Sequence, residues 1–276
     1  MNFLKHRRVH RRWRRGAAAV AAALALSLSV PAALGAGVKV NGTPLSAENG
    51  WVENGTSYIT LRAYAGLTGQ KLTWNGSQAS LTGSGLDLRV SPGTIYLLVN
   101  GRALYVAGGV RVVDGKLALP LRVLAQATGA RLSWDGASGT AVLNTAGAKA
   151  PQADYNEEEL YWLARIISSE SKGEPMLGQI AVGNVVVNRV KDSRYPDTIK
   201  DVIFDTNYGV QFQPVSNGTI YEEPVQSAVL AAKMTLEGAQ VVGDSLYFFA
   251  PALSQGTWIV NNATYHTTIG NHQFYQ

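Results

Sequence analysis

The sequence predicts an α+β protein, in which the N-terminal half is a duplicated strand-helix-strand domain and the C-terminal half is mainly helical. Two observations support this prediction. A stretch in the first half occurs twice, with equivalent residues 60 positions apart, and the second half has apolar residues at helical spacing. A segment of small residues with one proline separates the two patterns. We therefore expect a leader at residues 1–36, a repeat domain at 37–146, a linker at 147–154 and a second domain at 155–276.

The leader has the layout of a signal peptide. Seven Lys and Arg residues precede an apolar run from Ala17 to Ala36, which contains Pro31 and ends in small residues. We expect secretion, with cleavage near Gly35 or Ala36. A retained N-terminal membrane anchor stays open as the alternative, because the apolar run is long enough to span a bilayer.

Removal of the leader changes the charge balance of the chain. The full sequence has 24 basic and 19 acidic residues, and the leader holds seven of the basic and none of the acidic ones, so the mature chain has a net charge of −2. We therefore expect no nucleic-acid partner. The chain has no cysteine, and only His266 and His272 follow residue 36. We expect no metal site and no cofactor.

The repeat domain is defined by residues 58–74 and 118–134, which align without a gap. A Val-Asn-Gly sequence precedes each stretch and is typical of a tight turn between two strands. In each unit we expect strands, one short helix and a further strand that ends at a tryptophan. Gly69 and Gly129 follow the two helical stretches and are expected to end the helices in a left-handed conformation.

Residues 38–143 resemble the copper-amine-oxidase-like N-terminal domain of exported Gram-positive proteins. The absence of His and Cys there argues against a copper site. Two interpretations of Trp74 and Trp134 are considered. Both indoles could stack on sugars, so that this domain binds the cell wall, or both could be core residues that close each repeat. We favour the core, because a repeated aromatic residue at the same structural point usually repeats a packing role.

The second domain is expected to begin with an amphipathic helix. Asn156 is a plausible N-cap residue, and Glu159 stands in the capping-box position. The apolar stripe that follows comprises Leu160, Leu163 and Ile167, and Glu170 continues it. A carboxyl group on this face points toward the protein body, where burial raises its pKa toward neutrality, as a general acid requires. The alternative is a glutamate at a frayed helix end that reaches solvent.

A helix break separates this helix from a second one. Glu174 lies in a Gly-Glu-Pro sequence, after which a helix from Met176 to Val190 is apolar on nearly every side and is expected to be buried. Amide side chains interrupt its surface and need hydrogen-bond partners. We expect structural hydrogen bonds from Asn184 and Asn188, whereas Gln179 is a candidate for a substrate cleft.

Residues 164–190 resemble the signature of the SleB/CwlJ cell-wall hydrolases, a family that includes the spore-cortex-lytic enzymes. Further blocks at 211–214, 247–251 and 269–274 extend the resemblance over essentially all of residues 158–276. It implies a small lysozyme-like, mainly helical domain that acts on peptidoglycan glycan strands in the cell wall or spore cortex. It also implies that Glu170 is the catalytic acid and base. Ser171 and Glu174 would support it, Glu174 by holding the neighbouring loop.

The number of carboxylates bears on the mechanism. A lysozyme of the usual kind needs a second carboxylate, and the aspartates that follow the second helix fall in a surface-like segment. A single glutamate suits lytic transglycosylation, in which Glu170 protonates the glycosidic oxygen and then assists attack by the muramic acid 6-hydroxyl on C1. Attack by water would give hydrolysis instead.

Further candidates come from the same blocks. The substrate-binding candidates are Gln179, Phe212, Gln213, Tyr247, Trp258 and His272. We expect one or two of the three aromatic residues to line a sugar groove, and His272 to orient the site or to serve packing. Two alternatives stay open: an N-acetylmuramoyl-L-alanine amidase, for which two histidines are a poor metal set, and a non-catalytic wall-binding protein. We expect a monomer.

Overall fold

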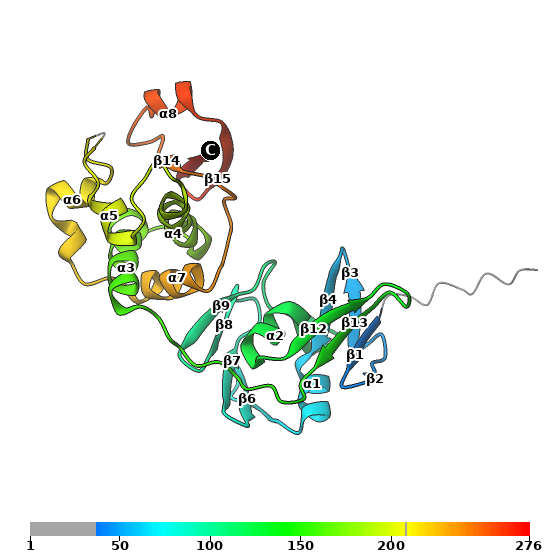
Figure 1. Ribbon diagram of the computed structural model, residues 1–276. Helices are drawn as coiled ribbons and strands as arrows, with labels where there is room; N and C mark the ends of the chain where they lie inside the picture. Colours follow the sequence, from blue (N-terminus) through cyan, green and yellow to red (C-terminus); the bar gives the residue numbers. More distant parts are fainter. Residues whose placement is uncertain (1–36, 208) are drawn as a thin grey trace, which may run out of the picture. The chain divides into compact units, whose positions relative to one another are not determined.

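The computed structural model describes residues 37–207 and 209–276, so the predicted signal peptide lies outside the described residues. The described chain has a strand-rich N-terminal half and a mainly helical C-terminal half, as the sequence predicts (Figure 1). Within these residues, no helix combines the length and the apolar character needed to cross a membrane.

The N-terminal half contains three sheets. Their strands are β1 (Gly37–Val40), β2 (Thr43–Pro44), β3 (Gly50–Glu53), β4 (Thr56–Thr60), β5 (Lys71–Trp74), β6 (Ala79–Gly83), β7 (Leu86–Val90), β8 (Tyr96–Val99), β9 (Arg102–Tyr105), β10 (Arg111–Val113), β11 (Lys116–Pro120), β12 (Arg131–Asp135) and β13 (Thr140–Asn144). The strand orders are β12-β13-β1-β2, β10-β11-β4-β3 and β5-β6-β7-β8-β9. Strand β1 pairs in parallel with β13, so the two ends of this half lie in one sheet.

Two short helices follow equivalent strands, α1 (Leu61–Thr68) after β4 and α2 (Leu121–Thr128) after β11. Both end as predicted, because Gly69 and Gly129 adopt the left-handed conformation with φ of 71°. The predicted Asn-Gly turns are also present, with positive φ at Asn41 and Asn100 and at the glycine after each. Local sequence therefore determines where these elements end.

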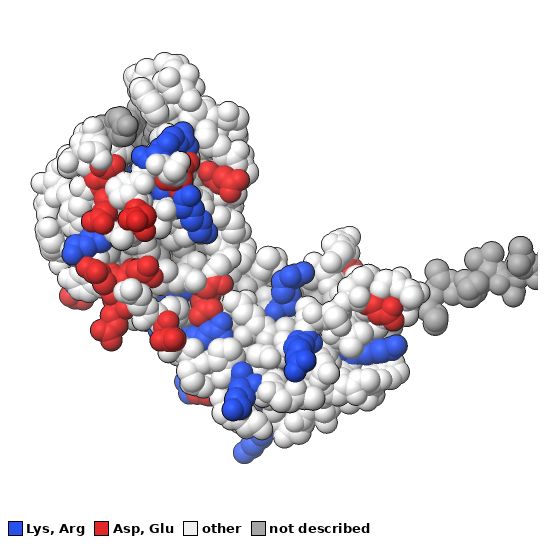
Figure 2. Space-filling model, viewed as in Figure 1, with Lys and Arg blue, Asp and Glu red and all other residues white. Residues whose placement is uncertain are grey.

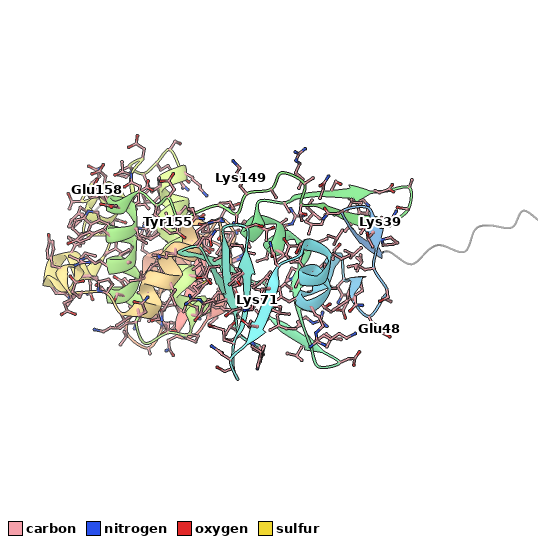
Figure 3. The ribbon with its side chains drawn as sticks, turned by 90° about the horizontal axis from the view of Figure 1, so that it is seen from below. Lys39, Glu48, Lys71, Lys149, Tyr155 and Glu158 are labelled. Carbon is pink, nitrogen blue, oxygen red and sulfur yellow. The ribbon has the colours of Figure 1, made fainter. Side chains whose placement is uncertain are left out.

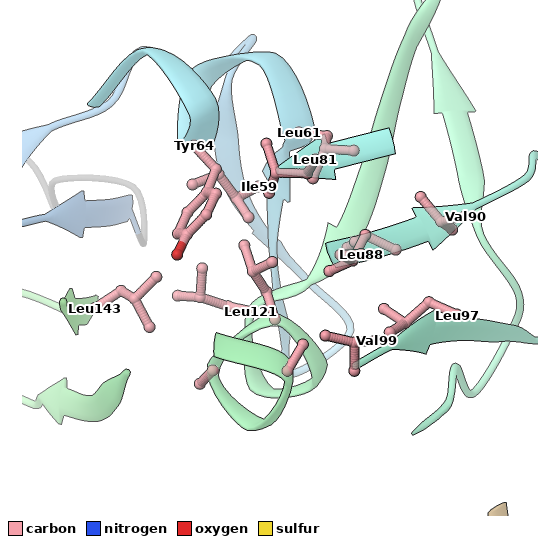
Figure 4. Close-up of a cluster of buried hydrophobic side chains, with 14 of the residues drawn as sticks. Ile59, Leu61, Tyr64, Leu81, Leu88, Val90, Leu97, Val99, Leu121 and Leu143 are labelled. Atoms are coloured by element: carbon pink, nitrogen blue, oxygen red, sulfur yellow. The ribbon is translucent and has the colours of Figure 1, made fainter. Parts of the chain in front are cut away.

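Strands β4 and β11 pair antiparallel at the centre of this half. Ile59 faces Leu119, the residue 60 positions later, and both side chains are fully buried. The surrounding core draws side chains from α1, α2 and all three sheets, and Figure 4 shows Tyr64, Leu88 and Leu143 among them. One continuous apolar core therefore joins the two repeats.

The two tryptophans do not belong to this core. Trp74 is 54% exposed and Trp134 is 55% exposed. Trp74 ends β5, as expected, whereas β12 continues one residue past Trp134 to Asp135. The prediction that they close the repeats as core residues is therefore wrong. The core is already filled by Tyr64 and by aliphatic side chains from the sheets and helices, which leaves both indoles on the surface.

The C-terminal half consists of helices and one small sheet. Its elements are α3 (Glu157–Ser171), α4 (Met176–Lys191), α5 (Ile199–Phe204), α6 (Gln213–Asn217), a 3-10 turn at Thr219–Tyr221, α7 (Gln226–Leu236), β14 (Tyr247–Phe249), α8 (Thr257–Asn262), β15 (Tyr265–Ile269) and β16 (His272–Tyr275). The antiparallel sheet has the order β14-β16-β15.

Helix α4 lies at the centre of the C-terminal half, as its apolar sequence predicts. It packs against α3, α5 and α7, and also against β14 and β15. A Cβ atom at Gly183 would lie 2.7 Å from Thr235 Oγ1 and 2.9 Å from Ile167 Cδ1, so only glycine permits this close approach of α4 to α3 and α7. Asn184 donates to Ala239 O and Asn188 donates to Gly243 O, which are the structural hydrogen bonds we expected.

Helix α3 begins as predicted, because the Asn156 side chain accepts hydrogen bonds from Glu158 N and Glu159 N. The linker before it contains no helix or strand, and its Ala153 N donates to Asn100 O in the β8–β9 turn. Figure 3 labels Lys149 and Tyr155 at either end of this stretch.

A second attachment between the two halves is an ion pair. Arg102 of β9 and Glu237 after α7 approach to 2.5 Å, and both side chains are largely buried. Tyr155 also donates its hydroxyl to Glu237, at 3.0 Å. The start of the C-terminal half is therefore joined to the repeat domain by buried polar contacts as well as by the chain itself.

The two helix-ending glycines allow a matched stability test. Gly69→Ala should lower the free energy of unfolding by about 1 kcal/mol, because alanine is strained at positive φ. Gly129→Ala should lower it by about 2 kcal/mol or more, because its Cβ atom would also overlap the carbonyl oxygen of Lys149. Urea denaturation of both variants measures the difference. Equal losses would contradict the role of the Lys149 contact.

Candidate active site

A cleft of about 620 Å³ opens beside the C-terminal end of α3. Its walls come from the last turns of α3, from α4, from the segment that leads into α6, and from β14 with the loop that follows it. The lining residues used below are Glu170, Arg189, Phe212, Gln213, Glu222, Glu223 and His272. These residues are far apart in the sequence. They come together because α3 packs against α4, α6 and the 3-10 turn, while α4 packs against β14, which pairs with β16.

Glu170 occupies the last turn of α3 and lines this cleft. Its side chain is half-buried, which agrees with its predicted place on the apolar face of the helix. Burial raises the pKa of Glu170 to about 7, and the positive charge of Arg189 acts in the opposite direction. The carboxyl group is therefore half-protonated near neutral pH and can both donate and accept a proton.

Arg189 projects from α4 into the same cleft and is the main site residue that the sequence analysis missed. The side chain is buried, and its Nε atom donates to Leu246 O at 2.8 Å. The Nη1 atom is buried and has no hydrogen-bond partner in the described part of the chain. Burial lowers the pKa of Arg189. One feature of the sequence could have identified Arg189, because it is an arginine in a helix that is otherwise apolar on nearly every side.

Aromatic rings surround the Arg189 guanidinium. Its Cζ atom lies 5.1 Å from the ring centres of Tyr195 and Phe212 and 5.8 Å from that of Tyr247. Phe212 is buried and also lines the cleft. The Arg189 guanidinium is therefore held in a fixed place beside the cleft.

Two further predicted residues lie in the cleft wall. Gln213 is the first residue of α6, and His272 is the first residue of β16. The His272 ring packs edge-on against Phe248, with ring centres 5.3 Å apart. Burial lowers the pKa of His272, and the nearby Glu174 carboxylate opposes that shift. The imidazole is therefore favoured in its neutral form.

Three of the proposed substrate-binding residues do not line the cleft. Gln179 is buried, and its amide donates to Glu174 O within the turn between α3 and α4. The Tyr247 ring lies 5.8 Å from the Arg189 Cζ atom and packs against Trp258 on α8, with ring centres 5.5 Å apart. Trp258 itself is 60% exposed. The sequence around these aromatic residues did not indicate which of the rings would face the cleft.

The two supporting residues have structural contacts. Ser171 is buried and donates to Ile167 O, one turn back in α3. Glu174 accepts hydrogen bonds from the backbone and side chain of Asn271, at 2.9 and 2.8 Å. A Cβ atom at Gly270 would overlap the Glu174 carboxylate. Glu174 therefore holds the β15–β16 turn against the turn that follows Glu170.

The electrostatics of Glu174 differ from those of Glu170. Burial acts to raise the pKa of Glu174, but the hydrogen bonds from Asn271 and the nearby His272 outweigh it and lower the pKa. Two carboxyl groups four residues apart therefore have opposite protonation preferences. Only Glu170 is suited to hold a proton near neutral pH.

Two other carboxylates at the cleft are largely exposed and were not considered from the sequence. The Glu223 side chain is 88% exposed and pairs with Arg165 at 2.5 Å, and Glu222 is 62% exposed and lies 3.8 Å from Lys172. Neither carboxylate is buried, and neither is held in a fixed position that faces Glu170. Residues 37–207 and 209–276 contain no group of three His, Asp or Glu side chains that could hold a metal ion.

The raised pKa of Glu170 predicts a pH-dependent stability cost. Between the unfolded pKa near 4.5 and the folded value of about 7, the folded chain holds a proton that the unfolded chain lacks. The free energy of unfolding, relative to that of Glu170→Gln, should therefore fall by up to about 3 kcal/mol as the pH rises through this window. Above the window the difference should stay constant. Thermal melts of both proteins from pH 4 to 9 measure this. A constant difference across the window would contradict the raised pKa.

Comparison with known families matches each half of the chain separately. Residues 173–275 match the model of the Cell Wall Hydrolase family. Residues 39–143 match the model of the Copper amine oxidase N-terminal domain. The second region contains no His and no Cys, so its residues do not fit a copper ion.

Two solved structures are similar to the C-terminal half. The catalytic domain of the germination-specific lytic transglycosylase SleB from Bacillus anthracis is 32% identical, with 46% of this chain and 100% of that chain covered and a TM-score of 0.41. The catalytic domain of the Bacillus cereus SleB protein is also 32% identical, with 45% and 93% covered and a TM-score of 0.40.

Curated relatives extend the comparison. The spore cortex-lytic enzyme of Bacillus cereus is 34% identical over 113 residues, and the match spans 41% of this chain and 42% of that relative. The cell wall hydrolase CwlJ of Oceanobacillus iheyensis is 32% identical over 103 residues, which are 35% of this chain and 72% of that relative. With most of CwlJ covered, and with the separate match to the family model, the chain belongs to the SleB/CwlJ family of cell wall hydrolases.

Proposed function

We propose that this protein is a glycosidase that degrades peptidoglycan by cleaving the MurNAc-GlcNAc glycan strand, as a lytic transglycosylase. One observation carries the proposal: a half-buried carboxyl group, Glu170, lies in a cleft with its pKa raised to about 7. Such a group is protonated in a large fraction of molecules at neutral pH and can act as a general acid. Membership of the cell wall hydrolase family supports peptidoglycan as the polymer that is cleaved.

The reaction uses Glu170 twice. Its carboxyl proton moves to the glycosidic oxygen as the bond from that oxygen to C1 of the muramic residue breaks, which releases the hydroxyl of the next sugar and leaves a carboxylate. That carboxylate then takes the proton of the muramic 6-hydroxyl, whose oxygen bonds to C1 and closes an anhydro ring. The proton on Glu170 is thereby restored, and no water is consumed.

Arg189 favours the second half of this cycle. Its positive charge lowers the pKa of Glu170 against the effect of burial, so the carboxylate formed after the first proton transfer is stabilised. Without such a charge, burial would keep the proton on Glu170 and weaken it as a base.

The carboxylates at the cleft support a mechanism with one glutamate. Glu222 and Glu223 are exposed and lie beside Lys172 and Arg165, whereas a second catalytic carboxylate needs a directed position beside the scissile bond. Phe212, Gln213 and His272 supply the apolar and polar surfaces that would hold the sugar rings. We propose the cell wall or the spore cortex as the place of action.

Substitution of the cleft carboxylates tests the single-glutamate mechanism. Glu170→Gln should lower the rate of strand cleavage by about 10³-fold or more, because the amide cannot transfer the proton. Glu222→Gln and Glu223→Gln are matched controls in the same cleft and should stay within about threefold of the wild type. Turbidity loss of purified peptidoglycan measures the rate. A loss in Glu223→Gln equal to that in Glu170→Gln would establish a two-carboxylate mechanism instead.

The pH dependence of cleavage follows from the same pKa. Because Glu170 must be protonated for the first step, the rate should fall as pH rises above about 7 and should drop tenfold per unit well above that value. Initial rates from pH 5 to 10, on soluble glycan fragments, measure the profile. A rate that keeps rising to pH 9 would exclude Glu170 as the acid.

Product analysis distinguishes the possible bond changes. Mass spectrometry of fragments released from vegetative peptidoglycan and from cortex should detect anhydro-muramic ends. Muramic ends with an added water would show hydrolysis at the same bond. Release of free stem peptides would instead identify an amidase.

A further inference from the structure

The two exposed tryptophans of the repeat domain lie in two separate grooves. The first groove has a volume of about 720 Å³ and includes Trp74, and the second has a volume of about 500 Å³ and includes Trp134. Single exposed apolar residues are common on protein surfaces. Two indoles that are each more than half exposed, at positions 60 residues apart, need a reason other than packing.

Each groove is formed by elements from both repeats. The first groove is formed by α1 and β5 together with the β10–β11 hairpin, and the second by α2 and β12 together with the β3–β4 hairpin. Ten of the eleven residues that line the second groove have a counterpart 60 positions away in the first. The two grooves are therefore equivalent surfaces, each requiring both repeats.

Each groove contains one charged and one aromatic side chain at equivalent positions. An exposed arginine from the first turn of the helix, Arg62 or Arg122, lines the groove together with the tryptophan. Neither Arg62 nor Arg122 forms an ion pair or a side-chain hydrogen bond with another described residue. An indole face beside a free guanidinium suits a ligand with an apolar ring face and an adjacent carboxylate or carbonyl oxygen.

The charge of the repeat domain favours an anionic ligand. Residues 37–146 contain nine Lys and Arg but five Asp and Glu, whereas residues 155–276 contain seven and thirteen. Figure 2 shows this difference on one face, where acidic side chains gather over the C-terminal half and basic ones predominate over the N-terminal half. The repeat domain is thus the part of the chain that attracts a negatively charged polymer.

We propose that the two grooves are glycan-binding sites, each of which stacks an N-acetylated sugar of a peptidoglycan strand on its tryptophan and pairs a carboxylate of the lactyl or peptide substituent with its arginine. Two equivalent sites on one rigid domain bind a repeating polymer more tightly than one site does. The proposal concerns retention on the wall and does not depend on the bond that Glu170 cleaves.

The test uses the full chain with Glu170→Gln, so that the polymer is not degraded. In this background, Trp74→Ala, Trp134→Ala and the double variant are sedimented with purified peptidoglycan from which phosphate-containing polymers have been removed. We expect each single variant to bind about 3–10-fold more weakly and the double variant at least 30-fold more weakly. Trp74→Phe, which keeps an aromatic face, should retain most of the binding.

Two controls make the result specific. Arg131→Ala removes a positive charge at an exposed position outside both grooves and should bind like the parent, whereas Arg62→Ala and Arg122→Ala should bind more weakly. Thermal melts should show that all variants fold. Unchanged binding by the double tryptophan variant, an equal loss with Arg131→Ala, or binding that requires the phosphate polymers would overturn the proposal.

A separate readout distinguishes this proposal from the proposed function. With Glu170 restored, the tryptophan variants should cleave short soluble glycan fragments at the wild-type rate, because the cleft is unaltered. If Glu170→Gln kept full activity while the tryptophan variants lost binding, the wall-binding proposal would stand and the single-glutamate mechanism would fail. Loss of fragment cleavage in the well-folded double variant would contradict a role confined to retention.

Discussion

The burial of the Glu170 carboxyl group at the end of α3 is the constraint on which the proposed chemistry depends. Its raised pKa results from desolvation, and that desolvation requires α3 to lie closely on a helix that is itself enclosed. Gly183 permits this approach, because any larger residue there would meet Ile167 and Thr235. The turn after α3 is then held by the bonds between Glu174 and Asn271. Core packing and loop attachment together fix the protonation behaviour of a single side chain.

The same site contains groups that packing alone would disfavour. A half-buried carboxyl group and a buried arginine both lose hydration on folding, and the Nη1 atom of this arginine has no hydrogen-bond partner among the described residues. Surrounding elements offset part of this cost, since Leu246 O and three aromatic rings contact the guanidinium. Local rules of stability are therefore broken at the place where the proposed mechanism moves a proton, which is typical of functional sites.

The two halves of the chain divide the physical tasks. The repeat domain is cationic and presents two equivalent grooves, whereas the catalytic half is acidic and contains the cleft that Glu170 lines. Equivalence of the grooves follows from the antiparallel pairing of β4 with β11, in which Ile59 meets its own counterpart, Leu119. This pairing places the hairpin of each repeat beside the helix of the other. Under the two proposals made above, one domain holds the polymer that the other domain cuts.

The sequence by itself determined the local features of this protein, because their causes are local. Asn156 starts α3, Gly69 and Gly129 end α1 and α2, and the apolar stripe that ends at Glu170 turns this carboxyl group toward the body. Only the tertiary structure decided that Arg189 reaches the cleft, that Gln179 does not, and that both repeat tryptophans are exposed. Spacing along one element cannot show which neighbours fill a core or which surfaces two distant segments form together. Those outcomes depend on how α4 is enclosed and on the exchange of hairpins between the repeats.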